Sequence, residues 1–229
     1  MINLPVNSNN AERFDLHAED RVMRGPGSIA AETSGSIELT QPLITSITQE
    51  LTDGDPVLAA FWRAEQGKFR YHYVTFRATF LPDNAGFDNA RVAIQLGPNQ
   101  PPDAVIAWSM SPQLLADSKK MSESAKLDID FKLVKAEFGE EREIPGQTWF
   151  LRRLKEQTAT PYWEFQRTKV SAIDGQFCFH LVTRTVANLP AFGELSARAT
   201  INKRSFWIFR RSDTAATPAS MRFDLPLTT

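Results

Sequence analysis

Residues 69–80 read FRYHYVTFRATF, and this stretch decides the fold because aromatic and β-branched residues dominate it. Alternate side chains of a strand point to opposite faces. Tyr71 and Tyr73 therefore share one face, whereas Val74 and Phe76 share the other. The stretch predicts a long strand whose apolar face changes near residue 73. Either a β-bulge or passage of the strand from one environment into another accounts for that change.

Similar patterns recur on both sides of this stretch. They predict strands over residues 36–39, 91–96, 104–108, 127–133, 149–151, 161–165, 177–184, 197–209 and 221–225. Within them, residues 206–209 (FWIF) are all apolar, which is typical of a central strand covered on both faces. Many short strands separated by Gly- and Pro-rich turns favour an all-β fold. We expect an antiparallel two-layer β-sandwich, jelly-roll or immunoglobulin-like.

Asp174-Gly175 is the clearest turn signal in the chain. An Asp-Gly pair tolerates positive φ at both central positions, as a type I′ hairpin turn requires. Apolar runs flank it, with Trp163 and Phe165 before it and Phe177 after it. The pattern predicts a β-hairpin here.

One or two short helices are expected near residues 43–66, in the N-terminal third. Ile44, Ile47 and Leu51 have helical spacing, although the threonines among them leave a strand as the alternative. Residues 57–62 (VLAAFW) follow Pro56 and form either a short helix that begins with proline or a buried strand.

The chain divides by composition into three parts. We expect an irregular N-terminal segment over residues 1–35, a β-sandwich domain over residues 36–211, and a C-terminal tail over residues 212–229 whose alternation at 221–225 indicates an edge strand. The Ser- and Lys-rich residues 110–124 are the best linker candidate. An alternative with two modules would split there.

Composition excludes several classes of protein. Hydrophobic residues make up 42% and charged residues 23% of the 229 residues, which is typical of a globular chain. A single cysteine excludes an intramolecular disulfide. No apolar run approaches the roughly 18 residues that a membrane-spanning helix needs. The first residues, MINLPVNSNN, lack the basic and apolar regions of a signal peptide, so we expect a cytoplasmic protein.

The formal net charge of −1 conceals an asymmetry. Residues 1–141 carry 13 Lys and Arg against 20 Asp and Glu, whereas residues 142–229 carry 13 against 7. This pattern indicates either charges dispersed over one fold, or a basic face for an anionic partner or for head-to-tail assembly.

Few residues suggest catalysis or metal binding. Cys178 and His180 lie two positions apart on one strand face, a spacing that allows both to ligate one zinc, but a packed cysteine beside a half-exposed histidine is the simpler explanation. The chain has no serine-hydrolase, kinase, Walker or dinucleotide-binding motif. We therefore assign no catalytic residue, cofactor or metal.

The best candidate patch is basic with aromatic residues interspersed. Its cations are Arg152, Arg153, Lys203, Arg204, Arg210 and Arg211. They stand next to Trp149 and on both sides of residues 206–209, so they are candidates for contact with an anion or a protein partner. The alternative is an apolar core strand whose charged ends are solvated.

The sequence thus predicts a non-catalytic cytoplasmic β-sandwich that binds another protein or associates with itself. Nucleic acid is not an expected partner, and no membrane span is expected. One alternative is a hydrolase whose dispersed residues, including His72, His180 and Asp128, converge in space. The other is a carbohydrate- or anion-binding domain.

Overall fold

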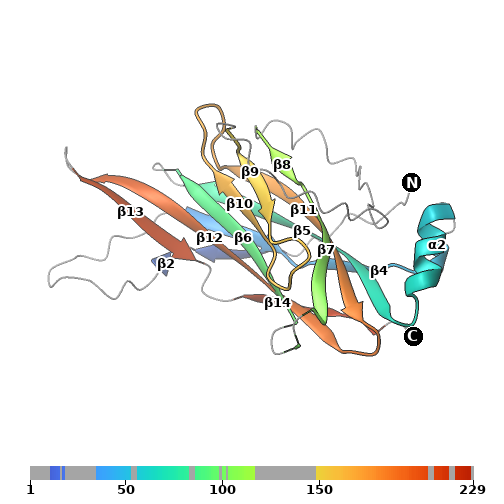
Figure 1. Cartoon of the computed structure of the whole chain (residues 1–229). Helices are drawn as coiled ribbons and strands as arrows, with labels where there is room; N and C mark the ends of the chain where they lie inside the picture. Colours follow the sequence, from blue (N-terminus) through green and yellow to red (C-terminus); the bar gives the residue numbers. More distant parts are fainter. Residues whose placement is uncertain are drawn as a thin grey trace.

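The computed structural model describes residues 11–15, 17–18, 35–52, 56–82, 86–97, 100–101, 103–116, 148–205, 209–216 and 220–227. These residues form two antiparallel sheets with two short helices (Figure 1). The all-β sandwich and the short N-terminal helices predicted from the sequence are confirmed.

The first sheet has six strands. In spatial order they are β1 (Ala11–Asp15), β3 (Gly35–Thr40), β5 (Phe69–Pro82), β11 (Gly175–Val186) and β7 (Val105–Ser111), with β4 (Leu43–Ser46) also paired to β5. The second sheet has eight strands. They are β2 (His17–Ala18), β13 (Phe209–Ala216), β12 (Ala191–Ser205), β6 (Asn89–Leu96), β10 (Tyr162–Gln166), β9 (Leu151–Leu154) and β8 (Leu114–Leu115), with β14 (Met221–Leu225) also paired to β12.

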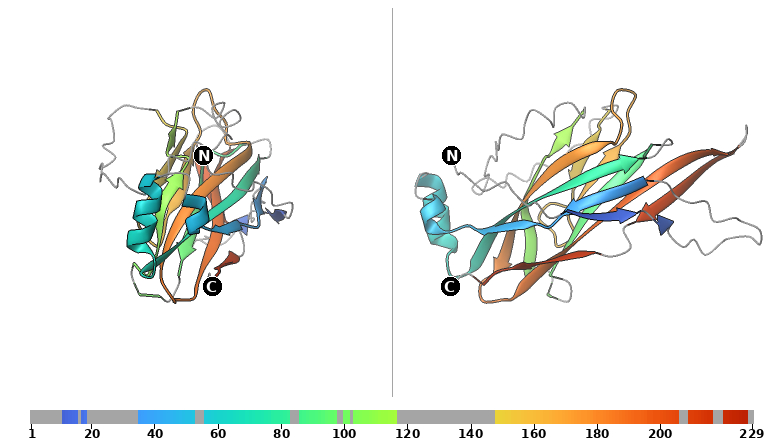
Figure 2. Two further views of the ribbon diagram at one scale, coloured as in Figure 1. Left: turned by 90° about the vertical axis from the view of Figure 1, so that its right-hand side faces the viewer. Right: turned by 180° about the vertical axis from the view of Figure 1, so that it is seen from behind.

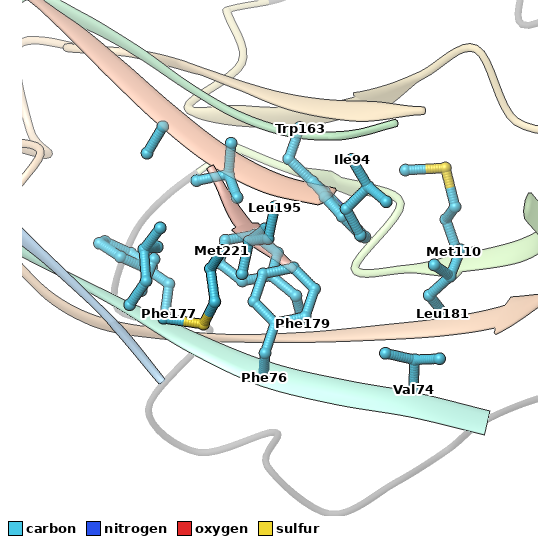
Figure 3. Close-up of a cluster of buried hydrophobic side chains, with 14 of the residues drawn as sticks. Val74, Phe76, Ile94, Met110, Trp163, Phe177, Phe179, Leu181, Leu195 and Met221 are labelled. Carbon is cyan, nitrogen blue, oxygen red and sulfur yellow. The ribbon is translucent and has the colours of Figure 1, made fainter. Parts of the chain in front are cut away.

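The main core lies between the two sheets. Figure 3 shows Val74, Phe76 and Phe179 of the six-stranded sheet pointing toward Trp163 and Leu195 of the eight-stranded sheet. The Phe179 ring stacks on Phe76 at 5.1 Å and lies 4.8 Å from the Trp163 ring, measured between centroids. Alternation therefore buries one side of each strand, and the other side of each sheet faces away from this core.

The change of apolar face in β5 is explained by a second cluster. Tyr71 and Tyr73 point away from the main core and belong to a cluster with Phe61 and Trp62 of helix α2 (Pro56–Glu65), whose rings contact Tyr71. The register between β5 and β11 is continuous from Phe69 to Phe80. The strand thus passes from one environment into another, and no bulge interrupts this pairing.

Residues 43–66 contain both structures that the sequence left open. The chain forms strand β4, then the four-residue helix α1 (Gln49–Thr52), then α2, which begins at Pro56 as the proline predicts. Figure 2 shows α2 at one end of the molecule, beside the end of β5.

The hairpin predicted at Asp174-Gly175 is wrong. Strands β10 and β11 belong to different sheets, so the turn between them crosses the sandwich. Gly175 has a φ of 90°, but Asp174 is not among the residues with positive φ. The flanking apolar residues misled the prediction because Phe165 and Phe177 face each other across the core, with ring centroids 5.0 Å apart, instead of lying side by side in one sheet.

The single strand predicted over residues 197–209 is also wrong. Strand β12 ends at Ser205, and Ser205 pairs with Phe209 as the first residue of the antiparallel strand β13. The sequence between them contains no Gly, Pro, Asn or Asp, so nothing signalled the reversal.

Strands that precede residues 117–147 pair with strands that follow them in both sheets. In the eight-stranded sheet β6 pairs with the later strand β10, and in the six-stranded sheet β5 pairs with the later strand β11. At the C-terminal end, β14 pairs with Ala191–Leu195 of β12. The strand predicted over residues 127–133 lies outside the described residues.

Candidate anion-binding groove

One row of charged residues crosses the outer face of the eight-stranded sheet. Arg198 of β12 is opposite Arg91 of β6, Arg91 is opposite Glu164 of β10, and Glu164 is opposite Arg152 of β9. Figure 1 shows these four strands side by side. Trp163 and Phe165, which flank Glu164, are fully buried in the core, so alternation places the charged row on the opposite face.

A second row of uncharged polar residues runs beside the first. Thr200 of β12 is opposite Asn89 of β6, which is opposite Gln166 of β10. Together with Trp149, which precedes β9, the two rows line an open groove of about 480 Å³. This volume is within the range of small-molecule binding sites.

Glu164 organises the middle of the charged row. Its Oε1 accepts a hydrogen bond from Arg91 Nη2 at 3.3 Å, and its Oε2 accepts bonds from Nε and Nη2 of Arg152 at 3.1 and 2.9 Å. Both side chains of the Arg152–Glu164 pair are only 25% exposed. A guanidinium held by two bonds to one carboxylate oxygen keeps a defined direction, so the row is ordered before any ligand arrives.

Aromatic rings support the same two arginines. The guanidinium of Arg152 lies 4.2 Å from the centre of the Trp149 ring, and that of Arg91 lies 4.1 Å from the centre of the Tyr162 ring. Cation–π contacts of this kind fix an arginine side chain without neutralising its charge.

Arg198 differs from the other two arginines of the row. It is exposed, and within the described ranges no carboxylate forms an ion pair with it. Among the described residues, three guanidinium groups thus line the groove against the single carboxylate of Glu164. The formal charge of the lining is positive, and the unneutralised part lies at the Arg198 and Arg91 end.

Of the basic residues predicted as contacts, the structure places Arg152 in the groove and Arg153 outside it. Arg153 Nη1 donates to Met110 O and to Glu156 Oε1, at 2.7 and 2.8 Å. Glu156 Oε1 in turn accepts from the backbone N–H of Met110 at 2.8 Å. The Arg153–Glu156 ion pair thus bonds to both the N–H and the C=O of Met110 in β7, and so links this strand of the six-stranded sheet to β9 of the eight-stranded sheet.

The other four predicted contact residues lie on the β12–β13 hairpin. In backbone register Lys203 pairs with Arg211, and Arg204 pairs with Arg210. Their side chains are outside the described part of the chain. They remain predictions.

The residues of the hydrolase alternative do not converge. His72 is on the core side of β5, where its Nε2 donates to Pro226 O at 2.9 Å, whereas His180 is on the outer side of β11. There, a hydrogen bond of 2.6 Å joins His180 Nδ1 to the Tyr73 hydroxyl. Cys178 shares this outer face by alternation. Asp128 lies outside the described residues.

Burial changes the acid–base properties of these side chains. Removal from water lowers the pKa of His72 to about 4, and the charge of Arg70 acts in the same direction against the hydrogen bond to Pro226. Desolvation likewise lowers the pKa of His180 to about 4. It raises the pKa of Tyr73, so that the hydroxyl stays protonated. Both histidines are therefore neutral near pH 7.

Metal-ion clusters and membrane-spanning helices are both absent from the described part of the chain. No cluster of three or more His, Cys, Asp or Glu side chains there is arranged to hold a metal ion. None of the helices described here has the length and apolar character required to cross a membrane.

Sequence reasoning missed Arg91, Glu164 and Arg198. The signal was present, because each is a charged residue between buried neighbours within a strand. What the sequence did not provide was the strand order that brings residues 91, 152, 164 and 198 into one row.

Comparison with protein-family models, with curated proteins and with solved structures found no match for this chain.

Proposed function

We propose that this protein is a non-catalytic binding module that takes an anionic group of its partner in the groove on the eight-stranded sheet. One observation carries the proposal: Arg198 and Arg91 are directly opposed on adjacent strands, and Glu164, the only carboxylate among the described lining residues, contacts Arg91 and Arg152. An anion between Arg198 and Arg91 relieves their repulsion and uses guanidinium groups that are already oriented.

Pre-organisation is what distinguishes this groove from an ordinary charged surface. Binding normally costs conformational entropy when long side chains become fixed. Here Glu164 and the Tyr162 ring already hold Arg91, so less of that cost remains. The groove also lies on strands paired on both sides, which makes its floor rigid.

The proposal gives a specific form to the expectation of a protein-binding or assembly module, since a partner protein or a second copy of the chain also carries anionic groups. We propose the cytoplasm as the location because the one cysteine, Cys178, is unpaired. The hydrolase alternative is not taken further because His72 and His180 lie on opposite sides of the sheet.

Isothermal titration calorimetry with sodium sulfate at low ionic strength tests the proposal. We expect saturable binding that weakens as sodium chloride is added. Arg198→Gln and Arg91→Gln should each weaken it about tenfold, the effect of losing one charge-assisted hydrogen bond.

The matched control is Arg222→Gln. Arg222 is an exposed arginine of the same sheet that stacks on Phe192 outside the groove, so its removal should leave sulfate binding unchanged. Absence of binding to the unmodified protein, or equal losses in all three variants, would refute the proposal.

A further inference from the structure

We propose that the ligand of the groove is an acidic carbohydrate, an inference that rests on the anion-binding function proposed above. The two ends of the groove then bind different parts of one ligand molecule. The carboxylate, sulfate or phosphate of the sugar lies between Arg91 and Arg198, and its hydroxyl groups and ring lie toward Glu164, Gln166 and Trp149.

The order of charges along the row is the first argument. Glu164 lies between Arg91 and Arg152, so the row reads positive, positive, negative, positive across strands that are about 4.8 Å apart. A polymer with a charge on every unit, such as a nucleic acid, would place one anion against Glu164. A ligand charged at one end and rich in hydroxyl donors beyond it avoids this, because the carboxylate oxygens accept hydrogen bonds.

The uncharged row is the second argument. Asn89 and Gln166 are exposed and lie on adjacent strands beside the charged row. A carboxamide both donates and accepts hydrogen bonds, as does a sugar hydroxyl, so the two amides match a row of hydroxyl groups. An inorganic anion such as sulfate can accept from the amide NH2 groups but offers no donor to the amide carbonyl oxygens.

Trp149 is the third argument. Its ring lines the groove and is partly exposed, with Arg152 against it. Because Arg152 covers one face of this ring, the C–H face of a pyranose would pack against the remaining exposed part of the ring, which is rigid apolar area. The groove volume of about 480 Å³ suits a short oligosaccharide.

The position of the groove argues against an acidic peptide. Peptides that bind sheets commonly add a strand at an edge, where backbone N–H and C=O groups are free. Strands β6 and β10 are paired on both sides, so the groove offers side chains alone. Recognition through side chains favours a ligand whose own polar groups are densely spaced, as in a sugar.

Calorimetric titration with four probes tests the inference: 3′-sialyllactose, which carries one carboxylate on its terminal unit, the neutral trisaccharide galactosyl-lactose, the peptide triglutamate, and sodium sulfate. We expect 3′-sialyllactose to bind at least tenfold more tightly than triglutamate or sulfate, and the neutral trisaccharide not to bind measurably. Gln166→Leu should weaken 3′-sialyllactose binding about tenfold and leave sulfate binding unchanged. Gln95→Leu changes an exposed glutamine of β6 outside the groove and should affect neither.

The outcomes separate the two proposals. If sulfate binds but 3′-sialyllactose binds no better than triglutamate, or if Gln166→Leu has no effect on 3′-sialyllactose binding, the carbohydrate inference is overturned while the anion site stands. If the neutral trisaccharide binds as well as 3′-sialyllactose, or if no probe binds, the anion-binding function itself fails.

Discussion

Arg91 and Arg198 occupy directly opposed positions on strands β6 and β12, on the outer face of the eight-stranded sheet. Like charges opposed across strands destabilise a sheet, by a few tenths to about 1 kcal/mol. Arg91 has Glu164 as a partner, whereas Arg198 has no ion-pair partner among the described residues. The arrangement is therefore unfavourable for folding and favourable for binding an anion.

The first prediction concerns the stability of the unliganded protein. Arg198→Gln removes the repulsion, so we expect the free energy of unfolding at low ionic strength to rise by about 0.2–1 kcal/mol. Urea denaturation followed by tryptophan fluorescence measures it. The gain should shrink in 0.5 M NaCl, because salt screens exposed charges. A loss of stability would show that Arg198 has a structural partner instead.

The second prediction separates two consecutive arginines. Arg153→Gln should lower the free energy of unfolding by about 1–3 kcal/mol, since it removes a hydrogen bond to the buried Met110 carbonyl and the ion pair with Glu156. Arg152→Gln removes a partly exposed ion pair and should cost about 1 kcal/mol or less. In sulfate titrations we expect the larger loss of affinity from Arg152→Gln, because of these two arginines only Arg152 lines the groove. Identical effects of the two variants would contradict the assignment.

The third prediction concerns the attachment of β14. Gly193 of β12 is opposite Phe223 of β14, and a Cβ at Gly193 would lie 2.2 Å from the Phe223 ring. Gly193→Ala should therefore cost about 1–3 kcal/mol of stability. Combining it with Phe223→Leu should recover part of that loss relative to the sum of the single variants, which thermal denaturation of all three can measure. Strict additivity would mean that the two residues do not touch.

The fourth prediction is a loss of stability in mild acid. The unfolded chain protonates His72 and His180 near the ordinary pKa of 6.5, whereas the folded protein does so only at about 4. The free energy of unfolding is then fully retained above pH 6.5. It falls as the pH drops through this window, by up to about 1.4 kcal/mol per pH unit for each histidine.

Urea midpoints between pH 7.5 and 5.5 measure this slope, in a range where carboxyl groups contribute little. Replacing His180 with Gln should reduce the slope over this range by about half a proton on average, and replacing His72 with Asn by about the same amount again. A slope that neither substitution changes would mean that both imidazoles are accessible to water in the folded state.

The sequence predicted the fold class because alternation is a local property of a strand. Residues 69–80 identify β5 and the change of its apolar face. Tyr71 and Tyr73 are large side chains on the second face, and they are buried in a cluster that includes residues of α2. The hairpin prediction at Asp174-Gly175 failed because the local signal of a turn does not say whether the next strand stays in the same sheet. Sheet membership depends on packing across the core. Phe165 and Phe177 face each other from the two sheets and are not paired in one hairpin.

The groove was harder to predict for the same reason. Arg91, Arg152 and Arg198 are 61, 46 and 107 positions apart in their three pairs, and each alone resembles a solvated strand residue. The asymmetry of charge between the halves of the chain did not help, because Arg91 comes from the acidic half and the other two from the basic half. Only the strand order β12-β6-β10-β9 makes them neighbours.

The most direct test of the central claim is an NMR titration of the arginine Nε–Hε signals with sodium sulfate. The account predicts that the signals of Arg91 and Arg198 shift together along one saturable binding curve while the signal of Arg222 does not move. Uniform small shifts of all exposed arginines without saturation would contradict it, because they would mean that sulfate finds only a general ionic atmosphere and no site.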